Sequence, residues 1–184
     1  MNGEIEVSGT GSFKKYSIFI SYRVDSDADF AGKLFDLCEA SGYSTYIDKE
    51  RIRDGHKWAE EFVDGLSNSR VFIPIISKAG QKERFSNLNA DSYCDNVLLE
   101  YRLALEYLEK QRIELIYPIF IPRVDNGSGK YTSSYFAQGA LPQCPKVFVN
   151  SVEEKVNFHL ERQGLGSSPL LEDRKTVEAV VKEM

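Results

Sequence analysis

Two short segments far apart in the chain carry polar side chains where an α/β protein can do chemistry. Residues 19–23 (FISYR) end an apolar run with a serine, a tyrosine and an arginine. Residues 94–100 (CDNVLLE) open a helical pattern and place Glu100 one turn in. In an open parallel sheet, both kinds of position face the crevice at the carboxyl ends of the strands, where ligands bind. This predicts a chemical role for Glu100, whose negative charge the N-terminal end of a helix favours.

The position of Glu100 on its helix is consistent with a site at the border of the core. The apolar stripe of this helix comprises Val97, Leu98, Tyr101, Ala104, Leu105 and Leu108. Glu100 falls just off its edge, beside Ala104 and Tyr107, so it is neither central in the stripe nor on the solvated back. An ordinary surface glutamate is the competing interpretation, because charged residues on helices are usually solvated.

Other kinds of reactive site find little support. The two histidines, His56 and His159, lie far apart, which disfavours a Cys–His or Ser–His nucleophile, and His159 is expected to pack in an amphipathic helix. Cys38, Cys94 and Cys144 have no CxxC spacing, so we expect neither a zinc site nor a disulfide framework. The sequence contains no Walker A or GxGxxG motif, which disfavours those nucleotide-binding modes.

The composition predicts one cytoplasmic domain with short appendages. The chain has 184 residues, 42% of them apolar, and no apolar run has the length of a membrane span. A net charge of −5 argues against nucleic acid as a partner. Residues 1–14 lack the features of a signal peptide and are expected to form a flexible arm. One domain is expected over residues 15–163, followed by an extension with a helix over 164–184.

Short apolar runs alternate with helical patterns, which predicts an α/β fold with a doubly wound parallel sheet and helices on both faces. The expected strands cover residues 16–20, 43–47, 71–76, 113–121 and 146–149. Pro74 and Pro118 lie inside two of these runs. Because proline removes a donor from the ladder, we expect those two strands to be edge-like or locally bulged.

The expected helices are set by periodicity and by capping residues. The first is capped by Ser26, is closed by Gly42 and carries a face of Phe30, Leu34, Leu37 and Cys38. The second carries Trp58, Phe62, Val63 and Leu66 on one face. The others cover about residues 95–110, a helix begun by a Ser151–Glu154 capping box, and residues 172–184.

Over residues 16–162 the chain resembles a TIR (Toll/interleukin-1 receptor) domain. The resemblance rests on FISYR after the first strand, YIDKERIRDG after the second, VFIPIIS as the third, and CDNVLLE before IELIYPIFI. It is closest to the NAD-cleaving TIR domains of axon-degeneration proteins and their bacterial and plant relatives. It implies a flavodoxin-like five-stranded sheet and an NAD⁺ glycohydrolase that releases nicotinamide and ADP-ribose or a cyclic isomer. Activation by self-association in immune or cell-death signalling is also implied.

The resemblance implies that Glu100 is the catalytic residue. The nicotinamide of NAD⁺ is already cationic and departs without being protonated, so the second carboxylate of ordinary glycosidases is unnecessary. One ionised carboxylate that stabilises the ribosyl oxocarbenium is sufficient. NAD⁺ is thus a substrate, and no cofactor, metal, nucleic acid or membrane partner is expected.

The resemblance also implies a set of substrate-binding residues, namely Ser21, Tyr22, Arg23, Glu50, Trp58 and Asn96. Arg23 suits phosphate or ribose oxygens, and its alternative is a salt bridge to Asp25 or Asp48. Ser21 could bind the ligand or cap the turn. For Trp58, anchoring its helix in the core is the preferred interpretation, and stacking on a base across an assembled interface is the alternative.

The polar loop after the second strand corresponds to the BB loop of the family. Its implied self-association residues are Asp48, Ile52, Arg53, Asp54 and Gly55, and a plain solvated loop is the alternative. The chain departs from its relatives at Asn96, where a tryptophan often precedes the glutamate by four residues. The stretch 80–91 is also longer than in compact relatives. Tyr93 could replace the missing ring, although packing is its expected role. Asn96 therefore favours the alternative function, a non-catalytic module that acts through TIR–TIR contacts.

Overall fold

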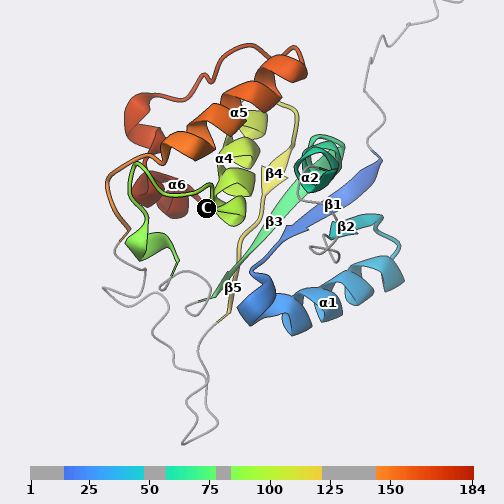
Figure 1. The fold of residues 1–184 in the computed structure, drawn as a ribbon. Coiled ribbons are helices and arrows are strands. Elements are labelled where there is room, and N and C mark those ends of the chain that lie inside the picture. The colour runs from blue at the N-terminus through green and yellow to red at the C-terminus, as the bar shows by residue number, and fades with distance from the viewer. Residues whose placement is uncertain (1–14, 48–56, 78–83, 122–143) are drawn as a thin grey trace, which may run out of the picture.

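The computed structural model describes residues 15–47, 57–77, 84–121 and 144–184, without the side chains of residues 57–60 (Figure 1). Its strands are β1 (Tyr16–Ser21), β2 (Thr45–Ile47), β3 (Ser69–Ser77), β4 (Leu115–Ile116) and β5 (Ile119–Ile121). Its α-helices are α1 (Val24–Ala40), α2 (Lys57–Ser67), α4 (Asn96–Glu109), α5 (Asn150–Arg162) and α6 (Val177–Glu183). Short 3-10 helices within these described ranges are η1 (Phe85–Asn87) and η3 (Glu172–Lys175).

The strands form one five-stranded sheet in the order β2-β1-β3-β4, and β5 also pairs with β3. All four pairings are parallel, and the register places Phe19 beside Phe72 and Ser21 beside Pro74. The sheet therefore confirms the predicted α/β fold. Strand β1 lies between β2 and β3, so its carboxyl end is flanked by strands on both sides.

Two apolar layers cover the two faces of the sheet, as expected for a doubly wound fold. Successive residues of β1 point to opposite faces. Phe19 therefore joins the large cluster under α2, α4, α5 and α6, whereas Ile20 joins the smaller cluster under α1. Figure 1 shows α1 on one side of the sheet, and α4, α5 and α6 on the other.

The two prolines interrupt the sheet at one level. The expected strand over residues 113–121 is divided into β4 and β5 around Tyr117-Pro118. β4 pairs with Val71 and Phe72, and β5 pairs with residues 75–77, so Pro74 falls between the two pairings. The register offset is the same on both sides of this gap, so the pairing is interrupted but the expected bulge is wrong, because no extra residue is inserted. The edge-like alternative is wrong for β3, which is paired on both sides.

Three local predictions for the C-terminal part of the chain are wrong. Residues 146–149 form no strand, because the carbonyls of Pro145 and Val147 accept hydrogen bonds from the first N–H groups of α6. No Ser151–Glu154 capping box starts α5, which begins at Asn150, and Ser151 Oγ instead donates to the Ser92 carbonyl at 2.8 Å. The helix expected over residues 172–184 is broken into η3 and α6, and Thr176 caps α6.

The buried face of α1 also differs from its periodicity. The helix begins at Val24, ahead of the expected cap Ser26, and it buries Ala31 and Cys38. Phe30 and Leu37 are 39% and 63% exposed, because the sheet meets the helix on the side of the small residues. The expected apolar face of α2 is confirmed for its described members, since Phe62, Val63 and Leu66 are all buried.

The end of the chain belongs to the main core. The buried side chains of Leu170, Val177, Val180, Val181 and Met184 lie in the same cluster as those of α4 and α5. Residues 164–184 are therefore joined to the rest of the fold through shared apolar contacts. They cover the outer side of α4, the helix that carries Glu100.

Candidate functional site

Ser21 and Glu100 meet at the carboxyl edge of the sheet. Ser21 ends β1, Glu100 lies in the first turns of α4, and both are buried, with 1% and 3% of their surface exposed. Ser21 Oγ donates a hydrogen bond to Glu100 Oε2 at 2.5 Å. The structure thus brings together the two segments that the sequence singled out. The alternative of an ordinary surface glutamate is wrong, and the Ser21 hydroxyl bonds the carboxylate.

Arg23 is tied to the start of the same helix. Asp95 is the N-cap of α4, and its Oδ1 accepts from the backbone N–H of Leu98 at 2.9 Å. Its Oδ2 accepts from Arg23 Nη1 at 2.7 Å. The expected partners were Asp25 or Asp48. Asp25 instead pairs with Arg84 at 2.8 Å, and Asp48 lies outside the described residues. Arg23 pairs with Asp95 because β1 ends, and α4 begins, at the same edge of the sheet.

The guanidinium of Arg23 is fixed in place and has hydrogen-bonding capacity to spare. It stacks on the ring of Phe85 at 4.7 Å from the centroid, and its side chain is 12% exposed. Its Nε and Nη2 are buried and have no hydrogen-bond partner within the described ranges. This Nε–Nη2 edge is the one that binds carboxylates and phosphates in a bidentate manner. Buried donors without a partner carry a desolvation cost, which a bound anion would remove.

The other sequence-predicted site residues are placed less closely. Asn96 is the first residue of α4 and is half-buried next to Asp95, whereas the ring of Tyr22 is buried with Ile20, Ala31 and Ile75 beneath α1. Tyr93 is 97% exposed, so its expected packing role is wrong. Trp58 belongs to α2, but its side chain is outside the described part. The remaining predicted residues lie entirely outside the described ranges. They are the substrate-binding residue Glu50 and the self-association residues Asp48, Ile52, Arg53, Asp54 and Gly55.

Two residues of the site were missed by the sequence analysis. Asp95 directly before a helical pattern is an N-cap signal that could have been recognised, and its bond to Arg23 follows once both are placed at one edge. Phe85 lies in an irregular polar stretch and gave no signal. Beside the site, burial raises the pKa of the Cys94 thiol, which therefore stays protonated at neutral pH.

In the part of the chain that the structure describes, no three side chains of histidine, cysteine, aspartate or glutamate converge in a way that could hold a metal ion. Within the same ranges, none of the helices combines the length and the apolar composition that crossing a bilayer requires.

A sequence model described as the TIR domain matches residues 18–139, about two thirds of the chain. The chain belongs to the TIR domain family. The matched region contains Ser21, Arg23, Asp95 and Glu100 and ends before α5. The helices α5 and α6 of this TIR protein follow the matched residues.

One curated protein with detectable similarity carries an activity in its name. It is the probable 2' cyclic ADP-D-ribose synthase TcpO of Methanobrevibacter olleyae, 22% identical over 116 residues. The match covers 63% of this TIR chain and 31% of that protein. The chain therefore spans about a third of the length of the curated relative that it matches.

Solved structures that contain TIR domains are similar to this chain at low sequence identity. The TIR domains of the activated Roq1 resistosome, which directly recognizes the pathogen effector XopQ, are 18% identical, with a TM-score of 0.49. That match covers 91% of this chain and 82% of the other. A metazoan TIR-STING receptor from C. gigas is 18% identical, with a TM-score of 0.47, over 80% of this chain and 41% of the receptor.

Proposed function

We propose that this TIR domain is an NAD⁺ glycohydrolase that cleaves the bond between nicotinamide and ribose. The observation that carries the proposal is the buried Glu100 carboxylate, which Ser21 holds at the sheet edge where ligands of this fold bind. The name of the relative from Methanobrevibacter olleyae supports the same substrate class. The products are nicotinamide and either ADP-ribose or a cyclic isomer.

Glu100 acts by charge in this proposal. The glycosidic C–N bond breaks with its electron pair going to the pyridinium nitrogen, so nicotinamide leaves neutral. The ribosyl cation that remains is stabilised by the carboxylate, whose effect is larger in a buried site than in water. Water, or a hydroxyl of the same ADP-ribose, then adds to the cation and releases a proton. The hydrogen bond from Ser21 fixes the direction in which the carboxylate points.

Arg23 binds the substrate through its phosphates. Its Nη1 is held by Asp95 and its plane rests on Phe85, so the guanidinium is oriented before the ligand arrives. The unpaired Nε–Nη2 edge is suited to two oxygens of a diphosphate. Because the Arg23 side chain is already ordered in the free protein, it loses less conformational entropy when the ligand binds.

Self-association completes the proposed activity. We expect TIR–TIR contacts, with residues 48–55 at the interface, to activate the enzyme in the cytoplasm during immune or cell-death signalling. Contacts between different faces of two copies can continue into open filaments. The turnover per protomer is then expected to rise with protein concentration.

Turnover of etheno-NAD, followed by fluorescence, tests the role of Glu100. The variant Glu100→Gln keeps the volume and an acceptor for Ser21 but removes the charge, so turnover should fall about 100- to 1,000-fold. Glu154→Gln, on the exposed side of α5, is the matched control and should retain full activity. Equal rates for Glu100→Gln and the unchanged protein would remove Glu100 from the mechanism.

The second candidate function is a non-catalytic TIR signalling module. It is favoured by Asn96, since an amide offers no ring for stacking on a purine. Its signature is self-association in light scattering, combined with no turnover at high protein concentration with a crowding agent. Measured turnover that depends on Glu100 would exclude it.

A further inference from the structure

The side of α4 that faces away from the sheet edge carries a row of charged residues. Arg102, Glu106 and Lys110 follow one another at intervals of four, so they lie on one stripe of the helix. At 3.6 residues per turn, Arg102 projects about 160° away from Glu100 around the helix axis. The helix therefore presents its proposed catalytic carboxylate on one side and this charged stripe on another.

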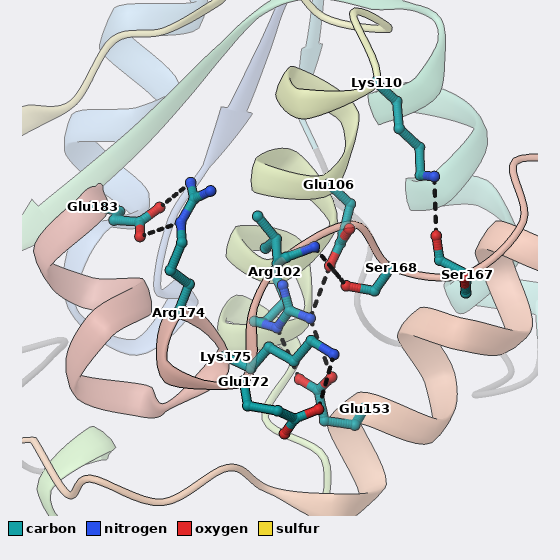
Figure 2. A network of polar contacts seen from close by, with 11 residues as sticks. Arg102, Glu106, Lys110, Glu153, Ser167, Ser168, Glu172, Arg174, Lys175 and Glu183 are labelled. Atoms are coloured by element: carbon teal, nitrogen blue, oxygen red, sulfur yellow. Dashed lines mark hydrogen bonds and ion pairs between the residues drawn. The ribbon is translucent and has the colours of Figure 1, made fainter.

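Each member of the stripe is held by a group from outside the helix (Figure 2). The guanidinium of Arg102 donates two hydrogen bonds to the carboxylate of Glu153 in α5, from Nε at 2.8 Å and from Nη2 at 3.1 Å. Glu106 Oε1 pairs with Arg102 Nη2 at 2.9 Å and accepts from Ser168 Oγ at 2.5 Å. Ser168 belongs to residues 163–184, which we call the C-terminal strap.

Tyr107 of α4 and Lys110, the C-cap residue of this helix, also bind the strap. Lys110 Nζ donates to the carbonyls of Leu165 and Ser167, at 2.7 and 3.0 Å. The hydroxyl of Tyr107 donates to Gln163 Oε1 at 2.7 Å. The strap and α5 thus contact α4 through directional polar bonds as well as through apolar packing.

The burial of these charged side chains constrains their positions relative to one another. Arg102 and Glu106 are 1% and 0% exposed, and Glu153 is 18% exposed. Leaving a buried charge without its partner is strongly unfavourable. The ion pairs among Arg102, Glu106 and Glu153 therefore tolerate little displacement of any of these side chains. The bidentate fork of Arg102 adds a directional constraint, since both bonds form only when the guanidinium and the carboxylate are coplanar. An apolar surface alone would permit α4 to rotate or slide slightly.

A small rotation of α4 would matter at Glu100. Side-chain atoms lie about 6 Å from the axis of a helix, so a rotation of about 10° displaces them by about 1 Å. A misplacement of about 1 Å in a reacting group can cost about 100-fold in rate. Arg102, Glu106 and Glu100 lie on one helix, and Arg102 is two positions after Glu100 in the chain.

We propose that Arg102 is a positioning residue, and that its buried network with Glu106, Glu153 and Ser168 sets the rotation of α4 that aims Glu100 at Ser21. The inference rests on the proposed NAD⁺ glycohydrolase function. It assigns a role to α5 and to the C-terminal strap, which follow the residues matched by the family model. Activity thus depends on the integrity of residues that contact no substrate.

Kinetics of full-length Arg102→Lys test the proposal. Lysine keeps the charge but lacks the fork, so kcat for etheno-NAD should fall about 10- to 100-fold. KM should stay within about twofold, because Arg23 and its neighbours are untouched. The milder variant Ser168→Ala, which removes one bond to Glu106, should show a smaller fall in kcat in the same direction.

Val180→Ala is the matched control for stability. It shortens a buried side chain of α6 in the same core without touching a polar contact. Rates are compared at a temperature where circular dichroism shows all variants folded. If Val180→Ala lowers kcat as much as Arg102→Lys does at an equal loss of urea midpoint, the role of Arg102 is general stability and the proposal is overturned.

A second measurement is independent of activity. A double-mutant cycle of Ser21→Ala and Glu100→Ala, each of which removes the hydrogen bond between the two side chains, measures their coupling from urea unfolding. The coupling should be clear in the unchanged protein and fall to within error in the Arg102→Lys background. A coupling that persists there would overturn the positioning role. Absence of NAD⁺ turnover in the unchanged protein would instead overturn the proposed function, and the cycle would still decide the role of Arg102.

Discussion

Ser21 Oγ donates a hydrogen bond to Glu100 Oε2 at 2.5 Å, although the two residues are 79 positions apart in the chain. The bond joins the last residue of β1 to the first turns of α4. It holds the carboxylate in one direction, and it also fastens the helix to the edge of the sheet. Stability and proposed activity therefore depend on the same contact.

Replacement of Ser21 by alanine should weaken both. Ser21→Ala removes a buried donor to a carboxylate, so the free energy of unfolding should drop by about 1–3 kcal/mol. Turnover of etheno-NAD should fall less than in Glu100→Gln, because the charge remains. Urea unfolding measures the first effect. Ser26→Ala, at an exposed position of α1, is the control that should leave the midpoint unchanged.

Asp95 has two roles that different substitutions separate. Asparagine caps helices about as well as aspartate does, so Asp95→Asn keeps the cap and loses only the charge opposite Arg23. Asp95→Ala loses the cap and leaves the buried guanidinium without its partner, which should cost about 2 kcal/mol or more in unfolding free energy.

Unfolding in urea, followed by far-UV circular dichroism, gives both values for Asp95. The control is Asp25→Ala, whose ion pair with Arg84 is exposed and should contribute less than about 0.5 kcal/mol. An equal loss for Asp95→Asn and Asp95→Ala would show that the cap contributes nothing.

Gly65 in α2 faces the ring of Tyr46. A Cβ at Gly65 would lie 2.8 Å from ring carbons of Tyr46, so Gly65→Ala should destabilise the protein by about 1–3 kcal/mol despite its better helix propensity. In a Tyr46→Ala background the same change should stabilise by about 1 kcal/mol. Thermal unfolding of the four proteins measures the reversal of sign.

Gly32 in α1 is the matched control for Gly65. An added Cβ there meets nothing within 4 Å, so Gly32→Ala should stabilise the protein by about 1 kcal/mol. If Gly65→Ala behaves like Gly32→Ala in the unchanged protein, the ring of Tyr46 has room to move away and the clash does not decide stability.

The stability of the fold should decrease at alkaline pH partly through Cys144. Burial, with a contribution from Glu178, raises the pKa of the Cys144 thiol from 9.0 to about 11. The folded chain then holds a proton that the unfolded chain releases. This contribution is complete below pH 9.0, declines as the pH rises, and is lost above about 11.

Comparison with Cys144→Ala isolates this contribution. Urea midpoints of the unchanged protein should approach those of the variant as the pH rises from about 8 to about 11. Burial also raises the pKa of Tyr107, but this group is present in both proteins and cancels in the difference. Parallel midpoint curves would contradict the assignment to Cys144.

Most elements could be predicted because their signals are local. The buried run of β1 and the helical spacing of Phe62, Val63 and Leu66 are properties of neighbouring residues, and the structure confirms them. Local signals failed where a distant segment used the same groups. Ser151 bonds the Ser92 carbonyl, and the carbonyls of residues 145 and 147 serve the start of α6. The apolar spacing of Phe30 and Leu37 likewise could not say which side of α1 the sheet would cover.

Strand ends and helix starts can be recognised locally, so the amino-acid sequence alone placed Ser21, Arg23 and Glu100 at one edge of a parallel sheet. The partners of these side chains depend on tertiary contacts that local patterns do not show. Arg23 pairs with Asp95, 72 positions away, and Arg102 with Glu153, 51 positions away. Such bonds form only when two helices or strands take one particular rotation and offset, and no periodicity in the sequence encodes that choice. The orientation of α4, on which the use of Glu100 depends, is for this reason a property of the folded chain.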